Sequence, residues 1–435
     1  MNDSPFFNRH PLHLQPDPSR VIVRAFRPAI EPRDYNPIDT TRANHIVARV
    51  MALDHAEAQA VLASVLDNFD DPPRNLVDAF ERRAAEMDRV FASHTAFTPT
   101  QRCLIGAYFL NEYSFEAAAL FNPSIVPHPD QTAVEPGSMR FILSLRAVGE
   151  GHISSLTFRR GTISGEGEIS IEPPVRLACL PEVTRRVGDT IDLAFGAETN
   201  LSQRVIFPVT EAQSNGIEDA RFVAFEDQGH TRYYATYTAY DGREIRSELI
   251  ETEDFLTFRL APLTGPAAVN KGMALFPRKI GGRYAMIARY DNESLHLVYS
   301  DNLLEWGLGI PILRPEYPWE FVQIGNCGSP IELDEGWLLL THGVGPIRRY
   351  SIGAVLLDKQ DPSRVIGRAR VPLVQPEKSE REGYVPNVVY SCGAMKVGSR
   401  IVLPYAISDT FSTIATVKID KLLEVLVDVL LPVPA

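Results

Sequence analysis

The chain has 435 residues, 45% hydrophobic and 23% charged, which is enough for more than one domain and a sizeable core. Its formal net charge of -12 argues against nucleic acid or an anionic membrane surface as a partner, because both require a basic face. The four cysteines are far apart and form no CxxC pair, so we expect neither a disulfide framework nor a structural metal site. The N-terminus lacks the apolar core of a signal peptide and no apolar run has the length of a membrane span, which predicts a cytoplasmic protein.

Residues 1–120 are predicted to be an N-terminal extension that contains an α-helical module. Asp54 and Glu57 have the spacing of a capping box, and apolar residues then recur at helical intervals. A second helix is expected within 72–92, which begins with two prolines, and one or two more follow Thr98 and Pro99. No coiled-coil heptads are sustained, so two roles stay open for this module: self-association into a homo-oligomer, or covering one rim of the next domain.

After Phe121 the pattern changes to short strands, and a similar unit of three strands recurs five times. The five units are residues 139–161, 220–252, 273–307, 329–358 and 388–420. Such units pack radially as blades, so we predict an all-β fold, a five-bladed β-propeller over residues 121–420, with a C-terminal tail at 421–435. Residues 171–213 fit no unit and are interpreted as a connection or a closing strand.

One polar residue ends the middle strand of each unit, and equivalent positions of a radial repeat point to the same place. These residues are Arg146, Tyr240, Arg289, His342 and Asp409. Any one of them alone would more often be structural, but together they predict a shared site. With Lys271 nearby, the cationic members suit an anionic co-substrate such as phosphate.

The stretch SNGIEDARFVAFED offers a catalytic acid. Glu218 and Asp219 are neighbours, and neighbouring side chains on a strand point to opposite faces, so only one is expected to face the site while the other pairs structurally, for example with Arg221. A single acid beside an anion site fits phosphorolysis, in which phosphate is the nucleophile. Inverting hydrolysis would need a second carboxylate roughly 6.5–9.5 Å from the first, and Asp409 and Glu320 are the candidates.

Several motifs resemble the mannoside phosphorylases and mannosidases of glycoside hydrolase family 130, in order, from about Phe121 to Asp420. They are GIEDARF, YYATYTAYDG, NKGMALFPRKIGGRYAMIARY, GWLLLTHGV, YSIGAVLLD and VPNVVYSCGA. The resemblance implies a five-bladed propeller enzyme that cleaves beta-mannosides with inversion at the anomeric carbon. It also implies that Asp219 is the general acid, that its proton passes through a sugar hydroxyl, and that phosphorolysis yields alpha-mannose 1-phosphate. The chain departs from the family's pattern at two positions: Ala220 stands where the family usually has a proline, and Ala288 where it commonly has a histidine.

The resemblance assigns the remaining site residues as well. The residues expected to bind phosphate are Asn122, Arg146, Lys271, Arg289, His342 and Tyr350. For contact with the sugar substrate the resemblance implies Asp409, and Glu218, Tyr240 and Asp241 are added as substrate-binding residues from their places at the strand ends of the second unit. No metal and no organic cofactor are expected. Inorganic phosphate is expected as the co-substrate.

Three functions are therefore weighed. The first is an inverting phosphorylase of beta-mannoside oligosaccharides, favoured because hydrolytic relatives have lost much of the basic set that this chain keeps. The second is an inverting beta-mannosidase that uses water, and the third is a non-catalytic sugar-binding propeller. The glycosidic linkage and the acceptor sugar stay open, because they depend on loop shapes at the mouth of the site.

Overall fold

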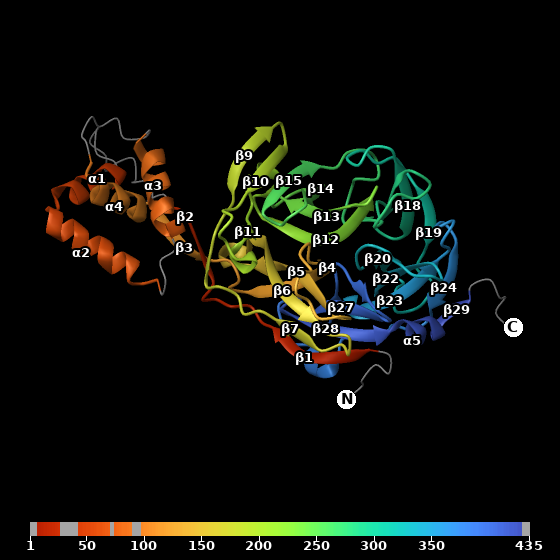
Figure 1. The fold of residues 1–435 in the computed structure, drawn as a ribbon. Helices are drawn as coiled ribbons and strands as arrows, with labels where there is room; N and C mark the ends of the chain where they lie inside the picture. Colours follow the sequence, from red (N-terminus) through yellow and green to blue (C-terminus); the bar gives the residue numbers. More distant parts are fainter. Residues whose placement is uncertain (1–6, 27–41, 70–73, 89–96, 429–435) are drawn as a thin grey trace. The chain divides into compact units, whose positions relative to one another are not determined.

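The computed structural model describes residues 7–26, 42–69, 74–88 and 97–428. The chain divides into two compact units, Val21–Ser114 and a larger one that combines Met1–Arg20 with Phe115–Ala435 (Figure 1). Strands dominate the described residues and helices are few, in agreement with the predicted β class. None of the helices described here has both the length and the apolar character that crossing a bilayer requires.

The smaller unit holds four helices and one antiparallel strand pair. Its elements are α1 (Arg42–Ala52), α2 (His55–Leu66), α3 (Arg74–Asp88), α4 (Pro99–Tyr108), β2 (Val21–Ala25) and β3 (Leu110–Ser114). The predicted capping box is confirmed, because the Asp54 side chain accepts from the Glu57 backbone N–H at 2.8 Å and Glu57 reciprocates at 3.0 Å. Thr98 caps α4 in the same way through Gln101. Pro72, Pro73 and residues 89–92, which belong to the second predicted helix, lie outside the described residues.

The helical prediction beyond residue 108 is wrong. Residues 110–114 form β3, which pairs with β2, and residues 119–127 form a strand of the larger unit. The partner of β3 lies about 90 residues earlier in the chain, so local spacing carries no sign of the pairing.

In the larger unit the strands form consecutive antiparallel groups along the chain. The first group is β4 (Ala119–Pro127), β5 (Met139–Val148), β6 (Ser154–Ile163), β7 (Ile169–Ile171) and β11 (Val205–Ile206). The second is β12 (Gly216–Asp227), β13 (His230–Tyr240), β14 (Ile245–Thr252), β15 (Thr257–Pro262), β10 (Thr190–Ala194) and β9 (Glu182–Val187). The first two groups are joined into one sheet by a single parallel contact between Gly216 and Ser154.

Three more groups complete the unit. The third is β16 (Ala274–Leu275), β17 (Tyr284–Ala288), β18 (Leu295–Ser300) and β19 (Ile310–Leu313). The fourth is β20 (Gln323–Asn326), β21 (Ile331–Glu332), β22 (Trp337–Val344), β23 (Tyr350–Leu357), β24 (Val365–Ala369) and β29 (Leu426–Asp428). The fifth is β25 (Val389–Tyr390), β26 (Met395–Val397), β27 (Arg400–Ile407), β28 (Phe411–Lys418) and β1 (Asn8–Leu14). The short strand β8 (Leu177–Ala178) and the helix α5 (Ile419–Glu424) lie outside these groups.

Two findings differ from a simple repeat. Residues 171–213 are more than a connection or a closing strand, because β9 and β10 form a hairpin that extends the second group beyond β15. The N-terminal strand β1 pairs with β28, so residues from both ends of the chain share one sheet.

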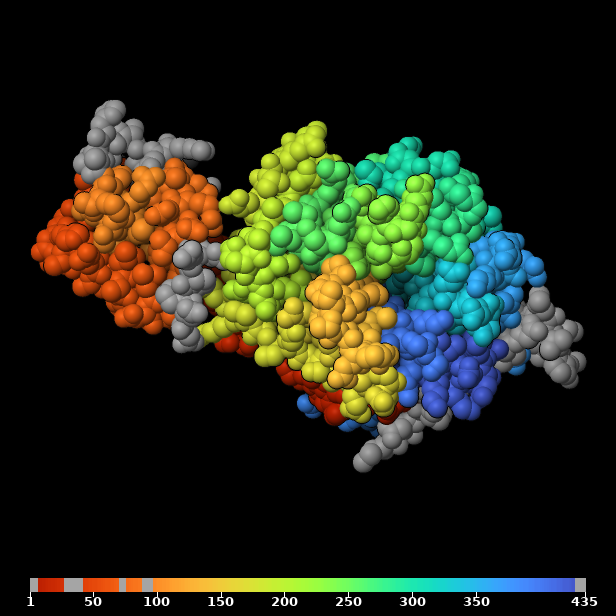
Figure 2. All heavy atoms as spheres, in the orientation of Figure 1, coloured from red at the N-terminus to blue at the C-terminus, as the bar shows by residue number. Residues whose placement is uncertain are grey.

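Each group packs its apolar face against the next. One cluster joins Phe158 to Phe222, the next joins Phe225 to Met286, and further clusters join the third group to the fourth and the fourth to the fifth. A small cluster of Phe121, Val148 and Ala406 connects the fifth group back to the first. In the space-filling view the groups follow one another across the visible face in chain order, from yellow through green to blue (Figure 2).

Candidate active site

A cavity of about 270 Å³ in the larger unit receives side chains from all five strand groups. It is lined by Phe121, Asn122, Arg146, Asp219, Lys271, Arg289, Gln323, His342, Arg348, Tyr350, Val385, Val388, Tyr390 and Asp409. Both carboxylates and all the arginines in this set come from residues at or near strand ends and turns, where the groups converge.

Asp219 lies on β12 in a backbone conformation that few residues adopt. Its φ is 54° and the pairing of β12 with β13 shifts register between Glu218 and Arg221, which marks a β-bulge. The Asn122 amide donates to Asp219 Oδ1, and Asn122 also has a positive φ of 49° at a register shift in β4. Two bulged strands therefore aim a carboxylate and an amide at each other, and such strained positions concentrate at functional sites.

The bulge corrects the prediction that Glu218 and Asp219 point to opposite faces. Arg146 contacts both, with Nη2 at 2.6 Å from Glu218 Oε1 and Nη1 at 3.5 Å from Asp219 Oδ1. The suggested pairing of Glu218 with Arg221 is also wrong, because Glu218 pairs with Arg146 and Lys271. Strand alternation holds only where the pleat is regular, and the bulge interrupts it here.

The surroundings of Asp219 decide its charge. Burial alone would raise the pKa of this carboxyl, but Lys271, Arg146 and Arg221, with the Asn122 hydrogen bond, hold it below the ordinary value. Asp219 is therefore ionised at neutral pH among these cations.

Arg221 holds two parts of the site in place. Its side chain is buried, Nη1 donates to the Asp219 carbonyl oxygen at 2.9 Å, and Nη2 donates to the Tyr390 hydroxyl at 2.6 Å. Arg221 therefore fixes both the acid's backbone and an aromatic wall of the cavity.

Arg289 differs from the other cations. Glu218 already neutralises part of the charge on Arg146 and Lys271, whereas Arg289 forms no ion pair with a carboxylate of the described residues. Its Nη1 is buried and has no hydrogen-bond partner in the described part of the chain. A buried cationic donor without a partner is unfavourable unless a ligand completes it, which indicates an anion site.

His342 is fully enclosed beside Tyr350 and Tyr390, with ring centroids 5.8 and 4.8 Å away. Burial, followed by the nearby Arg289 and Arg221, holds the pKa of His342 well below its ordinary value. The imidazole is therefore neutral, and its Nδ1 lies 3.1 Å from the Asn326 carbonyl oxygen, to which it donates.

A second carboxylate, Asp409, lines the same cavity. Burial raises its pKa to about 7, the negative charge of Asp219 adds to the rise, and Arg146 and Arg348 oppose it. Glu320, the other candidate for a second carboxylate, does not line the cavity. It is buried and paired with Arg368, and it accepts from the backbone N–H groups of Glu316 and Tyr317 at 3.0 and 3.1 Å.

The cavity brings together most of the residues singled out in the sequence. Those that line it are Asn122, Arg146, Asp219, Lys271, Arg289, His342, Tyr350 and Asp409. Glu218 contacts two of them, whereas Tyr240 and Asp241 are not among the lining residues, and Asp241 instead accepts from the backbone N–H groups of Arg243 and Glu244 at 2.7 Å. Sequence reasoning missed Gln323, Arg348 and Tyr390; of these, Tyr390 begins the fifth repeated unit and could have been found from that position.

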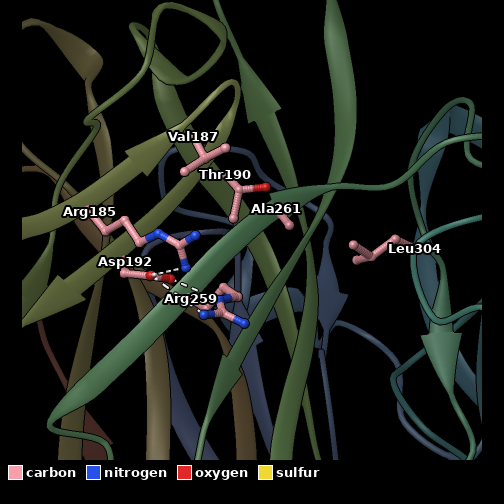
Figure 3. Close-up of a pocket in the computed structure, with 7 residues that line it drawn as sticks. All are labelled: Arg185, Val187, Thr190, Asp192, Arg259, Ala261 and Leu304. Atoms are coloured by element: carbon pink, nitrogen blue, oxygen red, sulfur yellow. Dashed lines mark hydrogen bonds and ion pairs between the residues drawn. The ribbon is translucent and has the colours of Figure 1, made fainter.

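Another cavity, of about 250 Å³, lies on the outer strands β9, β10 and β15. Figure 3 shows Arg185 and Arg259 both approaching Asp192, and Arg259 Nε lies 2.8 Å from Asp192 Oδ1. Because both arginines share this carboxylate, the outer cavity lacks a buried cation in need of a ligand. Within the described ranges, no cluster of three or more His, Cys, Asp or Glu side chains has the arrangement of a metal site.

Comparison with known proteins agrees with this geometry. The profile of a family described as beta-1,4-mannooligosaccharide phosphorylase matches residues 189–428, more than half of the chain. The chain is 35% identical over 220 residues to a 1,2-beta-oligomannan phosphorylase from Thermoanaerobacter sp., covering 49% of this chain and 72% of the relative. It is 30% identical over 242 residues to a beta-1,4-mannooligosaccharide phosphorylase from Ruminococcus albus, covering 51% and 70%.

The fold is likewise similar to solved structures. A beta-1,2-mannobiose phosphorylase from Listeria innocua, solved with beta-1,2-mannobiose, superposes with a TM-score of 0.52 at 21% identity. The match covers 71% of this chain and 92% of that structure. By its profile match and its curated relatives, the chain belongs to glycoside hydrolase family 130.

Proposed function

We propose that this enzyme is an inverting phosphorylase that cleaves beta-linked manno-oligosaccharides with inorganic phosphate to give alpha-mannose 1-phosphate. The observation that carries the proposal is the buried Nη1 of Arg289, a cationic donor that lines the cavity without a partner in the described residues. The names of the curated relatives, which are phosphorylases of beta-1,2- or beta-1,4-mannosides, support the same reaction.

The phosphate is bound by the cationic side of the cavity. Arg289, Arg146 and Lys271 supply positive charge, and Tyr350 and Asn122 supply neutral hydrogen-bond donors. His342, with Nδ1 engaged by Asn326, offers a neutral imidazole whose Nε2 can accept a hydrogen bond from the hydroxyl of a monohydrogen phosphate.

Asp219 is the general acid. A phosphate oxygen attacks the anomeric carbon, the bond to the leaving oxygen breaks, and the proton of Asp219 reaches that oxygen through a sugar hydroxyl. Asp219 takes up this proton from solvent when the bound anion offsets the charge of Lys271 and Arg146. Phosphate therefore serves both as the nucleophile and as the charge that makes Asp219 a competent acid.

Glu218 and Asp409 have different parts in this scheme. Glu218 holds Arg146 and Lys271 in place through its two carboxylate oxygens. Asp409, half protonated near pH 7, donates or accepts a hydrogen bond with the mannose hydroxyls. A carboxylate with this pKa is also well matched to general base catalysis at neutral pH, so the preference for phosphorolysis over hydrolysis rests on Arg289 and not on Asp409.

The architecture that we propose for residues 121–420 is a five-bladed β-propeller, with the site at one end of its axis. Five antiparallel groups in chain order, an apolar cluster between each consecutive pair, and a cluster between the fifth and the first support this arrangement. The Leu120 backbone N–H also donates to the Thr410 carbonyl oxygen at 2.8 Å, between the first and last groups.

Incubation with beta-1,2- and beta-1,4-mannobiose, with and without phosphate, tests the reaction. Phosphorus NMR should detect alpha-mannose 1-phosphate, and turnover should require phosphate. Free mannose released equally well without phosphate would establish the hydrolase instead.

Asp219→Asn tests the assigned acid. We expect kcat to fall by about 10²- to 10⁴-fold, the range that general acid catalysis supplies. Asp241→Asn makes the same chemical change in the same strand group but outside the cavity, and should stay close to wild type. Equal losses in the two variants would contradict the assignment.

A further inference from the structure

Two turns of the larger unit have the same backbone conformation but different residues at their strained positions. The turn 149–153 joins β5 to β6, and the turn 345–349 joins β22 to β23. In both, the first residue is a glycine whose N–H donates to the carbonyl oxygen four residues later, at 3.1 and 2.9 Å. In both, the third and fourth residues have a positive φ.

The third position distinguishes the two turns. It is Gly151 with φ 69° in the first turn and Ile347 with φ 55° in the second. A β-branched residue is a true outlier in this region, whereas glycine adopts it without penalty. Ile347 is also 88% exposed, so its side chain gains little from packing within the unit. A strained residue that contributes almost no packing points to a function for its side chain.

Two other exposed apolar side chains, Phe321 at 62% and Val322 at 60% exposure, lie on the segment that pairs with the end of the strand leading into this turn. The Val322 N–H donates to the Val344 carbonyl oxygen at 3.0 Å, which places the segment before β20 against the start of the turn. We call Phe321, Val322 and Ile347 the apolar collar.

The collar is continuous with the cavity. Gln323, which follows Val322, and Arg348, which follows Ile347, both line it. The turn is anchored to the fifth strand group, because Asn387 Nδ2 donates to the Ile347 carbonyl oxygen at 3.4 Å and the Asn387 carbonyl oxygen accepts from the Tyr350 N–H at 3.1 Å. The segments that carry the collar are therefore tied by hydrogen bonds to their neighbours, and each is directly followed by a residue that lines the cavity.

The size of the cavity indicates what lies against the collar. Sites that enclose a whole drug-sized ligand have volumes of about 300–1,000 Å³, and this cavity, at about 270 Å³, must hold phosphate together with one sugar ring. The second sugar of a disaccharide then lies at the mouth. Pyranose rings present an apolar face of C–H groups, which fits an aromatic and an aliphatic side chain.

We propose that the apolar collar is the binding surface for the leaving-group sugar, the ring that becomes the acceptor in the reverse reaction. The inference rests on the proposed phosphorylase function and adds the residues that select the acceptor. Ile347 is a specificity-determining residue, held toward the acceptor by the strained turn.

Reverse-direction kinetics test the proposal, because mannose 1-phosphate and the acceptor sugar can be varied separately. In Ile347→Gly and Phe321→Ala we expect the KM for mannose or mannobiose as acceptor to rise about fivefold, while the KM for mannose 1-phosphate stays within about twofold. Ile347→Gly should also keep or raise the Tm, since glycine relieves the strain, so a loss of acceptor binding cannot come from unfolding. Leu308→Ala, at a residue 68% exposed on the loop before β19, is the matched control and should change neither KM.

The outcomes separate this inference from the proposed function. If the wild type forms mannose 1-phosphate with phosphate but both collar variants keep the acceptor KM, the collar is not the acceptor surface and the phosphorylase assignment stands. If the wild type shows no phosphate-dependent turnover, both proposals fall. If sedimentation shows that the collar variants dissociate a wild-type oligomer while acceptor KM is unchanged, the collar is an interface between copies of the chain and the proposal is overturned.

Discussion

Glu218 and Asp219 are adjacent acids with different roles. Glu218 forms direct ion pairs with two cations, whereas Asp219 accepts an amide hydrogen bond and has its pKa lowered by nearby cations. Glu218 spans Arg146 and Lys271, one with each oxygen. Asp219 accepts a hydrogen bond from Asn122, and its pKa is lowered by the same two cations and by Arg221. Arg289 has a buried Nη1 without a hydrogen-bond partner in the described residues and shares no carboxylate with Arg146 and Lys271, which makes it the main attachment for an incoming anion.

Arg289→Ala should therefore weaken phosphate binding selectively. We expect the KM for phosphate to rise about 10- to 100-fold, the equivalent of one hydrogen bond to a charged group, with a much smaller change in the KM for the mannoside. Initial-rate kinetics with each substrate varied in turn will measure both. Arg289→Lys, which keeps the charge but loses the fork of donors, should recover part of the loss. An equal rise in both KM values would contradict the assignment.

The raised pKa of Asp409 predicts that the free energy of unfolding depends on pH. Its pKa is about 7 in the folded protein against an ordinary value of 3.8, so the folded state holds the proton more tightly than the unfolded state does. The stability that this proton contributes is complete below pH 4 and is lost as the pH rises through 7. Asp409→Asn removes the ionisation, so its Tm should exceed that of the wild type by a margin that grows between pH 4 and 8.

Thermal unfolding in phosphate-free buffers across this range checks the prediction. Asp241→Asn is the control of opposite sign, because backbone hydrogen bonds from Glu244 and Arg243 lower the pKa of Asp241. The stability that the Asp241 carboxylate contributes is already complete at pH 4, so the Tm of Asp241→Asn should lie below that of the wild type by a margin that stays constant between pH 4 and 8. A difference between Asp409→Asn and wild type that does not vary with pH would contradict the environment described for Asp409.

At the residue scale, sequence reasoning found most members of the site from the repeat. Four of the five predicted repeat positions, Arg146, Arg289, His342 and Asp409, line one cavity, whereas the fifth, Tyr240, does not. It failed where the backbone departs from the repeat. The bulge at Asp219 turned the acid toward Arg146, and no local pattern predicts which strand will bulge. Arg348 was missed because it belongs to a turn whose strained conformation is invisible in a list of side chains.

At the element scale, the strand that carries the acid is positioned by a glycine. Gly216 opens β12 with φ 146° and forms the parallel contact with Ser154 on β6. A Cβ at this position would lie 2.2 Å from Ser154 Oγ and 3.1 Å from the Ser154 backbone nitrogen. The close approach of β12 to β6 therefore requires a residue without a side chain, and it sets where Asp219 stands three residues later.

Gly216→Ala should push β12 away from β6. We expect a loss of about 1–3 kcal/mol in the free energy of unfolding, from overpacking, and a fall in kcat of about tenfold or more, because misplacing a catalytic group is costly. Denaturant titration and steady-state kinetics measure the two effects. Gly307→Ala, where a Cβ would meet nothing within 4 Å, should change neither by much. Wild-type stability in Gly216→Ala would show that the two strands can separate freely.

The elements that sequence predicted best are those specified locally. The capping boxes at Asp54 and Thr98 place the starts of α2 and α4 because all their contacts lie within three residues. The strands β1 and β3 were not predicted, since their partners are distant in the chain, and β1 pairs with β28 some 400 residues later. Long-range pairing is decided by which edges remain open after the rest has folded, and that information is spread over the whole chain.

At the scale of the whole molecule, the smaller unit is inserted into the sequence of the larger one. The two points where the chain leaves and re-enters the larger unit are held together by an ion-pair cluster. Arg20 ends the first segment of the larger unit and Glu116 lies at the start of its second. Arg20 pairs with Glu116, and Arg159 Nη2 on β6 lies 2.8 and 3.0 Å from the two Glu116 oxygens. All three side chains are almost fully buried. The carboxylate of Glu116 therefore compensates two buried arginines at the point where the chain leaves and re-enters the larger unit.

Glu116→Ala should be the most destabilising single change considered for this molecule. It leaves two buried guanidinium groups without their anion, and breaking a buried pair by removing one partner costs about 3–5 kcal/mol. The midpoint of urea unfolding should fall accordingly. The matched control is Glu172→Ala, which removes an exposed partner of Arg160 at 2.6 Å and should cost at most about 1 kcal/mol. Similar midpoints for the two variants would mean that water reaches the arginines around Glu116, and that the crossings of the insertion are not held by this cluster.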